Sequence, residues 1–301
     1  MKKSLPLVIN VILNTNRRED TLECLESLMA STYANQRTIV LDNHSSDGSA
    51  AAIEANFPDV QIILIEDNLG YAGNNNVGIE SALKQGADWV FVLNEDTILD
   101  PECTAELIAI GENRPDVGIV GPMVYHHDEP NYIQSAGGLV DDHLRGRHLA
   151  QNEQDHGQYK QPHAVDWITG CGILVRREAI NQVGFIDERF FYYVEEEEWC
   201  LRVKKAGWGI VHVPRAKLWH KGVQRNYQPK PSVTYYATRN QLLLLSKHNT
   251  KLKTWLVAWG YIIRNLTSWT VQPKWHSKRP HRDAMLWGAR DFVLKRWGQM
   301  P

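Results

Sequence analysis

The sequence predicts an α/β fold in which a mostly parallel sheet is flanked by helices and followed by a C-terminal helical extension. Over the first 125 residues, short apolar strands alternate with helical patterns, as in sheets covered on both faces. Residues 231–301 differ in charge, with 12 Lys and Arg against only Asp283 and Asp291, and they hold six of the 11 Trp. We therefore predict one domain over residues 1–240 and a basic, Trp-rich helical extension over 241–301.

Composition excludes several protein classes. The chain of 301 residues is 43% hydrophobic and 23% charged, which is ordinary for a globular protein and excludes a disordered chain. Its net charge of −2 combines +10 over residues 231–301 with −12 over residues 1–230. The four cysteines lie far apart without a C-x-x-C pair, which argues against a disulfide framework or a zinc site and fits a reducing compartment.

Apolar runs bounded by polar turns predict the elements of the first half. We expect strands over 7–13, 38–41, 61–65, 89–93 and 117–120. We expect helices over 20–30, 47–56 and 72–85 and after Pro101. Leucines at 22, 25 and 28 share one face of the first helix. Ser46 or Asp47 is the expected N-cap of the second helix.

The pattern changes after residue 125. Residues 126–165 are polar with little periodicity, which predicts a long functional loop or a short irregular hairpin. Order resumes over 165–170, and we predict helices over 176–183 and 195–206 and a strand over 209–213. We predict two helices in the extension. The first has an apolar stripe that comprises Leu252, Trp255, Leu256, Trp259, Ile262, Ile263 and Leu266, and the second covers residues 284–297.

Two interpretations of the extension remain open. Basic faces with interfacial Trp suit a helix that lies on an anionic membrane surface, whereas the apolar stripe could instead pack on the preceding domain. Nucleic acid is not an expected partner, because no recognition motif accompanies the charge. The best apolar run, residues 254–263, is ten residues long. Spanning a bilayer takes about 18.

Asn and Asp residues follow four consecutive predicted strands. They are Asn14 and Asn16, then Asp42 and Asn43, then Asp67 and Asn68, and finally Asn94 and Asp96. Ligands of such sheets bind at the carboxyl ends of the strands, so these side chains are candidates for a binding site. The alternative is that Asn and Asp are simply common in turns.

Three acidic or basic features could carry chemistry. Asp96, directly after a hydrophobic strand, could hold a divalent cation that binds a diphosphate, or could only cap the next helix. Residues 195–198 are four adjacent glutamates after the aromatic run 190–193, which suits a general base in an apolar pocket but also a favourable helix N-terminus. His220 could be a metal ligand, although a lone histidine is more often structural. Glycine-rich phosphate loops and a G-x-S-x-G elbow are absent from the sequence.

Five motifs in order make the chain resemble glycosyltransferase family 2, in the branch of bacterial rhamnosyltransferase-like enzymes with the GT-A fold. Residues 8–16 read VINVILNTN, like the family's opening strand and Asn-rich turn. Residues 41–49 read LDNHSSDGS, 68–78 read NLGYAGNNNVG and 93–97 read LNEDT. Residues 170–202 match the family's long block with an acidic pair after aromatic residues. The resemblance covers about residues 1–240, which implies that this domain is the catalytic GT-A domain, a Rossmann-like nucleotide-diphospho-sugar transferase fold.

The resemblance implies roles for individual residues. Glu196 matches the catalytic base, and Asp96 and His220 match the metal site. Acceptor-side positions are expected at Trp167, Gly170 and Glu195. Donor-binding positions are expected at Asn14, Asn16, Asp42, Asn43, Gly70, Gly73, Asn75 and Asn94, with Asp42 at the nucleotide base. Arg239 and Asn240 match a recurring pair to which the resemblance assigns no role.

Three departures from the family pattern affect these roles. Asn94 replaces the first Asp of a strict D-x-D motif, so more of the metal binding falls to Asp96. Glu95 stands where Pro is common and adds a carboxylate beside the metal position. Glutamates at 196 and 198 replace aspartates, which changes the reach of the side chain by one methylene but keeps the chemistry of the base.

The resemblance implies an inverting, metal-assisted glycosyltransferase. It would use Mg²⁺ or Mn²⁺, a dTDP- or UDP-linked sugar and a glycan or lipid-linked acceptor, with rhamnose named from the resemblance alone. The implied location is cytoplasmic, peripheral at the inner face of the bacterial membrane. Two alternatives remain at this point: a nucleotidyltransferase of related fold, and a non-catalytic membrane scaffold.

Overall fold

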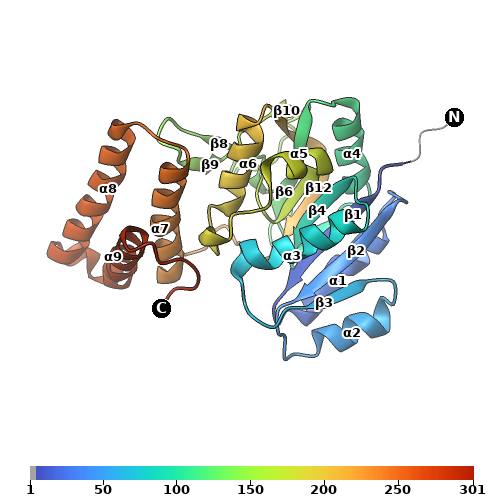
Figure 1. Ribbon diagram of the computed structural model, residues 1–301, viewed down its shortest axis with the longest axis horizontal. Helices are drawn as coiled ribbons and strands as arrows, with labels where there is room; N and C mark the ends of the chain where they lie inside the picture. The colour runs from blue at the N-terminus through green and yellow to red at the C-terminus, as the bar shows by residue number, and fades with distance from the viewer. Residues whose placement is uncertain (1–4) are drawn as a thin grey trace.

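The computed structural model describes residues 5–301 and has a large mixed sheet at one side and a group of three long helices at the other (Figure 1). Residues 1–4, the start of the predicted first domain, lie outside the described part. The predicted α/β class is therefore confirmed, including the helical C-terminal segment. The predicted boundary between residues 240 and 241 lies within a helix that runs over Pro231–Lys247.

The first half of the chain builds the parallel part of the sheet. Strands β1, β2, β3 and β4 are Val8–Asn14, Gln36–Asp42, Gln61–Leu64 and Trp89–Asn94. They pair in parallel in the order β4-β1-β2-β3. The helices between them are α1 (Arg18–Met29), α2 (Ser49–Asn56) and α3 (Gly70–Lys84). These elements agree with the predicted strands and helices to within a few residues at each end.

Alternation along the strands produces two cores. In β1, Val8 and Ile12 pack into the core on one face, while Ile9 and Val11 pack into the core on the other. Helix α1 and the helix α4 (Cys103–Asn113) contribute to the first core, whereas α3, α5 (Arg177–Val183) and α6 (Glu195–Lys205) contribute to the second. Because both faces are covered, the strands are apolar on both sides.

The second half of the chain extends the sheet with mixed strand directions. Strand β11 (Gly172–Arg176) runs antiparallel to both of its neighbours, β4 and β6 (Val117–His126). Beyond β6 lies β12 (Gly209–His220), parallel to β6. The short strands are β5 (Thr97–Leu99), β7 (Ile133–Ser135), β8 (Gly138–Val140), β9 (Gly146–His148) and β10 (His163–Ala164).

Several predicted boundaries are wrong for identifiable reasons. The strand predicted over 209–213 continues to His220, because a register shift between Val213 and Lys217 accommodates Pro214. Helix α2 begins at Ser49 with Gly48 at the N-cap in the left-handed conformation (φ 79°), so neither Ser46 nor Asp47 occupies the N-cap position, although Asp47 Oδ1 accepts from the backbone N–H of Ser49 at 3.1 Å. The polar segment 126–165 contains the predicted hairpin, which β8 and β9 form as a separate two-stranded sheet. Strand β5 was not predicted.

The C-terminal helices are α7 (Pro231–Lys247), α8 (Leu252–Val271) and α9 (Arg279–Val293), with a short 3₁₀ segment, η2 (Pro273–Lys278), between the last two. Helix α7 was not predicted, and the helix predicted over 284–297 begins and ends earlier, as α9. The predicted apolar stripe of α8 is divided between two environments. Trp255, Trp259, Ile262 and Leu266 pack against α7 and α9, whereas Leu252, Leu256 and Ile263 are exposed. Among the described residues, no helix has the length and apolar character of a membrane span.

Candidate active site

A cavity of about 410 Å³ lies at the carboxyl ends of β1, β2 and β4. The start of α3, an aromatic turn before α6 and the segment after β12 complete its wall. Its polar lining residues include Thr15, Arg17, Asn43, Asn68, Asn74, Asn94, Glu95, Asp96 and His220. This is the edge of the sheet at which ligands of open α/β folds bind, and it is where the sequence placed the candidate residues.

Three of the predicted donor-binding residues line this cavity, namely Asn43, Gly70 and Asn94. Asn14 and Asp42 lie behind the wall instead. The Asn14 side-chain amide donates to Asp42 Oδ2 at 3.3 Å, and Asp42 Oδ1 accepts from the backbone N–H of Ser45 at 2.7 Å. Both side chains are buried, so in this structure they fasten the two strand ends together.

The remaining predicted donor residues also contact the chain itself. Asn16 Oδ1 accepts from the backbone N–H of Ser46 at 2.8 Å, and Asn75 Nδ2 donates to the carbonyl oxygen of Tyr71 at 2.9 Å. A Cβ at Gly73 would come within 2.6 Å of the Leu69 Cβ, so this position needs a glycine for close packing at the start of α3. Gly73 and Asn75 are buried and Asn16 is exposed, and none of the three lines the cavity in the described structure.

Gly70 joins α3 to the aromatic turn that precedes α6. Its φ of +73° is in the left-handed region that favours glycine, and a Cβ there would collide with the backbone oxygen and the ring of Phe191. Phe191 therefore packs directly over the glycine. The contact brings two motifs together that are more than one hundred residues apart in the sequence.

Asp96 and His220 are in contact at the cavity wall, with Asp96 Oδ1 at 3.1 Å from His220 Nε2. The side chain of Gln134 lies 3.0 Å from the other ring nitrogen of His220 and fixes the ring. Burial favours the neutral form of Asp96, but the hydrogen bond and charge of His220 outweigh it and leave the pKa of Asp96 below its usual value. A Cβ at Gly222 would lie 2.6 Å from Asp96 Oδ2, so the backbone closes tightly over this carboxylate.

A carboxylate oxygen, an imidazole and the neighbouring Asn94 and Glu95 are a donor set that suits Mn²⁺ or Mg²⁺. Over residues 5–301, however, the side chains do not assemble three His, Cys, Asp or Glu into one group able to hold a metal. A cation here would therefore need ligands from outside the protein, such as diphosphate oxygens or water. Burial and the charge of Asp96 raise the pKa of Glu95 to about 8, so an added cation would stabilise its ionised form.

The predicted base, Glu196, lies at the first turn of α6, next to the cavity but not among its lining residues in the described chain. Burial raises its pKa, although the backbone N–H of Gly170 stabilises the carboxylate in part. One carboxyl oxygen, Oε2, has no hydrogen-bond partner in the described structure. Tyr71 connects this region to the cavity, since it lines the wall and its hydroxyl donates to the carbonyl oxygen of Gly170 at 2.7 Å.

Glu195 and Trp167, two other predicted acceptor-side residues, are also buried. Burial and the charge of Glu196 hold the pKa of Glu195 well above its usual value. Trp167 packs against His148 of the β8–β9 hairpin, with ring centroids 4.7 Å apart, and its indole N–H has no hydrogen-bond partner within the described residues. Neither residue lines the 410 Å³ cavity in the described structure.

A sequence model described as "Glycosyl transferase family 2" matches residues 11–184. The chain belongs to this family. An N-acetylglucosaminyl-diphospho-decaprenol L-rhamnosyltransferase of Mycobacterium tuberculosis (strain CDC 1551 / Oshkosh) is 30% identical over 247 residues, which are 75% of this chain and 80% of that protein. The dTDP-rhamnosyl transferase RfbF of Shigella flexneri is 25% identical over 227 residues, which are 72% of this chain and 73% of RfbF. This family 2 glycosyltransferase is thus similar to rhamnosyltransferases.

A solved structure supports the fold of the enzyme. The mannosyltransferase PcManGT from Pyrobaculum calidifontis, in complex with GDP-Man and Mn²⁺, superimposes with a TM-score of 0.60 over 98% of this chain and 89% of its own. The sequence identity is 12%, so the similarity concerns the fold alone. The expected GT-A architecture is confirmed by this likeness.

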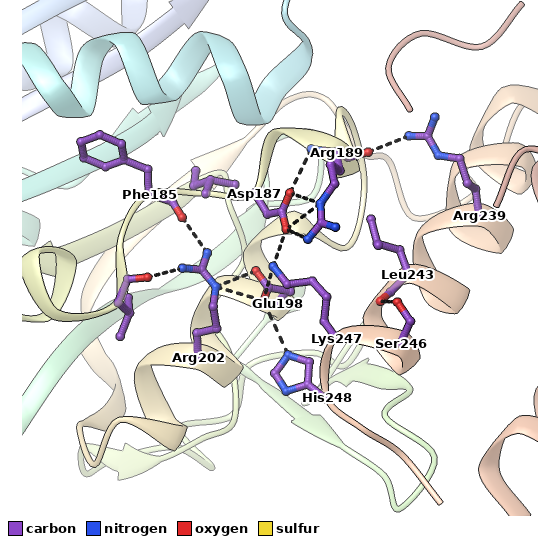
Figure 2. Close-up of polar contacts among 12 residues, drawn as sticks. Phe185, Asp187, Arg189, Glu198, Arg202, Arg239, Leu243, Ser246, Lys247 and His248 are labelled. Carbon is purple, nitrogen blue, oxygen red and sulfur yellow. Dashed lines mark hydrogen bonds and ion pairs between the residues drawn. The ribbon is translucent and has the colours of Figure 1, made fainter. Parts of the chain in front are cut away.

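The family match ends at residue 184, whereas the cavity lining continues to Tyr227, and residues of α7 contact the aromatic turn in its wall. Asn240 Nδ2 lies 2.8, 2.8 and 2.7 Å from the carbonyl oxygens of Phe190, Tyr192 and Tyr193. Arg239 donates to the carbonyl oxygen of Phe190 at 2.9 Å, and Figure 2 shows its contact with the backbone of Arg189. The pair that the sequence left without a role therefore holds the aromatic turn.

The aromatic turn needs this support because its backbone is strained. Phe191, Tyr193 and Val194 have φ values of 62°, 69° and 72°, and each non-glycine residue in the left-handed region costs about 1 kcal/mol or more. Phe191, Tyr192 and Tyr193 line the cavity, and Glu195 follows after Val194. The strain thus coincides with the wall of the site and the start of the glutamate run.

Glu198 differs from the other three glutamates of α6. It is fully buried, and its carboxylate pairs with Arg202 and with Lys247 of α7, each at 2.9 Å. Lys247 also pairs with Asp187, so three segments meet at one ion cluster (Figure 2). Burial favours the neutral acid, but His248, Arg202 and Lys247 outweigh it and lower the pKa of Glu198. Glu198 therefore ties α6 to α7.

Proposed function

We propose that the enzyme transfers a sugar from a nucleotide-diphosphate donor to an acceptor hydroxyl with inversion, and that Glu196 is the general base. The observation that carries the proposal is the Asp96–His220 pair at the wall of a cavity where the sheet's strand ends meet. Thr15, Asn43 and Asn68 supply polar groups along the same wall for the nucleotide sugar. The cavity volume of about 410 Å³ lies within the range of small-molecule sites.

Asp96 and His220 would hold Mg²⁺ or Mn²⁺, which when bound neutralises the negative charge that develops on the leaving diphosphate. Arg17 also lines the cavity and is close enough to Glu95 and Asp96 to interact with their charges. A role for Arg17 was not predicted, although this residue directly follows the Asn-rich turn after β1. We assign it to the diphosphate, because a guanidinium and a phosphate form strong charge-assisted hydrogen bonds.

Glu196 has the properties that proton transfer requires. Burial raises its pKa, which makes the ionised carboxylate a stronger base, and the unpartnered Oε2 is free to accept a proton from a hydroxyl. The base removes the proton as the acceptor oxygen attacks the anomeric carbon, and the nucleoside diphosphate leaves from the opposite face. Tyr71 lies between the base region and the donor cavity and would orient the acceptor hydroxyl.

We infer a dTDP- or UDP-linked donor, with rhamnose as the first sugar to test, because the rhamnosyltransferases above are similar over most of the chain. The acceptor is a glycan or a lipid-linked glycan. We further propose that the exposed apolar and basic residues of α8 and α9 bind an anionic membrane surface from the cytoplasmic side. Leu256 and Ile263 on α8 are 66% and 60% exposed, close in sequence to Lys253 and Arg264.

The direct test is donor hydrolysis and transfer across a panel of nucleotide sugars, with Mg²⁺, Mn²⁺ or a chelator present. Cation-dependent release of a nucleoside diphosphate from one or two donors would support the proposal and identify the sugar. Release of inorganic diphosphate from a nucleoside triphosphate and a sugar phosphate would instead indicate nucleotidyl transfer. A protein that binds none of the donors and turns over none of them would act as a scaffold.

A further inference from the structure

A second cavity, of about 400 Å³, lies between α7 and α8 on the side of the molecule away from the parallel strands (Figure 1). We call it the α7–α8 groove. Its lining is mainly apolar, with Val233, Ala237 and Leu242 on α7 and Val257, Ala258 and Ile262 on α8. Mostly apolar cavities of a few hundred Å³ are typical of sites for hydrophobic ligands.

The polar end of the groove is formed by the turn between β8 and β9. His143 and Arg145 of this turn line the groove, and His143 Nδ1 lies 3.4 Å from Thr254 Oγ1 of α8. Arg145 contacts Asp141 Oδ2 through Nη2 at 2.9 Å and through Nε at 3.0 Å, and both side chains are about half exposed, so an anion in the groove would share or replace this carboxylate. Within residues 5–301, no aspartate or glutamate lines the groove. Its charge therefore favours an anionic group beside an apolar chain.

The groove adjoins the proposed active site along two segments. Tyr227 lines the donor cavity, and Pro229, two residues further, lines the groove. On the other side, Gly146 of β9 packs against the carboxylate of Glu197, whose neighbour is the proposed base Glu196. A molecule in the groove with its polar end toward the β8–β9 turn would thus present that end near the base.

We propose that the α7–α8 groove binds the hydrocarbon chain of a lipid-linked acceptor, with the anionic head group at His143 and Arg145. The inference rests on the proposed function, because it assigns the acceptor of the same transfer reaction. The lining residues 233–241 extend about 12 Å along α7, at 1.5 Å per helical residue, which accommodates several methylene or isoprene units. The exposed apolar residues of α8 lie on the same helix and place the groove next to the surface at which such lipids reside.

The test uses the full chain and farnesyl diphosphate as a short lipid diphosphate probe, measured by calorimetry in excess inorganic diphosphate and chelator. Excess diphosphate occupies any site that recognises the head group alone. Ala237→Trp fills the groove from an exposed position on α7, so we expect it to fold and to weaken farnesyl diphosphate binding by at least about tenfold. Ala51→Trp, at an exposed position on α2, is the matched control and should bind the probe as the unchanged protein does.

Three outcomes would overturn the inference. The first is equal binding of farnesyl diphosphate by Ala237→Trp and by Ala51→Trp, and the second is equal binding of farnesyl and isopentenyl diphosphates by the unchanged protein. The third is a dimer that Ala237→Trp converts to a monomer while farnesyl diphosphate has no effect, since a second copy would then occupy the groove. Nucleotide binding is measured with the same three proteins in separate samples, which contain Mn²⁺ and neither the chelator nor inorganic diphosphate. Its loss in every sample would refute the proposed function, whereas normal nucleotide binding without a farnesyl effect refutes only the groove.

Discussion

Asn240 of α7 donates a hydrogen bond to the carbonyl oxygen of Tyr193, with a distance of 2.7 Å between Nδ2 and the oxygen. Tyr193 belongs to the wall of the proposed donor cavity, and both residues lie beyond residue 184, where the match to the family ends. The C-terminal helices are therefore connected to the proposed active site by a buried polar contact as well as by packing. A substitution in α7 should therefore change the binding of the donor.

Replacing Asn240 by Ala tests this connection. The variant loses its contacts with three carbonyl groups of a strained turn, and each such hydrogen bond contributes about 1 kcal/mol. We expect a lower melting temperature and a donor KM raised by roughly tenfold, because the aromatic wall shifts. Asn56→Ala is the control, since Asn56 Nδ2 also donates to one carbonyl oxygen but on α2. An unchanged donor KM in Asn240→Ala would show that the turn holds its shape without α7.

The sequence was a better guide to the fold than to the direction of single side chains. Alternating apolar runs predict β1 to β4 and α1 to α3, because hydrophobic periodicity is a local property. Helix α7 was missed because most of it is buried, so Leu242, Leu243, Leu244 and Leu245 give no alternation to detect. Strand β5 has three residues and pairs with β12, more than one hundred residues away.

The candidate site shows the same limit. Motif spacing brought Asn43, Asn94, Asp96 and His220 to one cavity, as the structure has them. Motif spacing does not reveal that Asn14 and Asp42 point to each other and not into the cavity. An Asn or Asp at the end of a strand gives the same sequence pattern whether it binds a ligand or holds the turn. Motif spacing also left Arg239 and Asn240 without a function, since their partners are backbone atoms, which no sequence motif records.

Asp96→Ala tests the proposed metal site. The Asp96–His220 pair supplies one carboxylate, so its loss should weaken cation-dependent nucleotide binding by about tenfold or more while leaving binding without a cation unchanged. Calorimetry with UDP or dTDP, with and without Mn²⁺, measures both quantities. Asp59→Ala, at an exposed position, is the control. If Mn²⁺ strengthens nucleotide binding equally in both variants, Asp96 does not hold the cation.

Glu196→Gln tests the proposed base. The amide keeps the size of the side chain but cannot accept the proton, so turnover should fall by roughly 10²-fold or more while donor binding is preserved. Because burial raises the pKa of Glu196, the acid limb of the rate profile should lie above the usual carboxyl range and should disappear in the variant. Glu197→Gln, one position along α6, is the control and should retain that limb. Near-normal turnover in Glu196→Gln would remove this residue from the role.

The glutamate run also predicts how stability depends on pH. Burial, followed by the charge of Glu196, raises the pKa of Glu197 from 4.5 to about 8, so the folded protein binds a proton that the unfolded chain releases. The contribution is therefore most favourable below pH 4.5 and is lost as the pH rises toward 8. We expect the melting temperature to fall between about pH 5 and 8. The change in melting temperature per pH unit should be smaller in Glu197→Gln, because this variant lacks the one proton, roughly, that unfolding would release from Glu197. Glu54→Gln, exposed on α2, should keep the original slope, and an equal slope in all three proteins would refute the assignment.

Charge reversal on α8 tests the proposed membrane surface. Lys251, Lys253 and Arg264 are exposed, and each basic residue near an anionic membrane contributes about 1 kcal/mol to binding. Replacing all three by Glu should reduce flotation with anionic liposomes by on the order of tenfold to a hundredfold, and high salt should weaken flotation of the unchanged protein. The matched control carries the same total change in charge at the exposed residues Arg37, Lys160 and Lys205, away from the C-terminal helices. These substitutions leave the packing of α8 and α9 against α7 in place, whereas a deletion of residues 250–301 would remove it. Equal loss of flotation in both triple variants would mean that net charge, and not the C-terminal surface, determines binding, and the absence of any flotation at low salt would contradict membrane association itself.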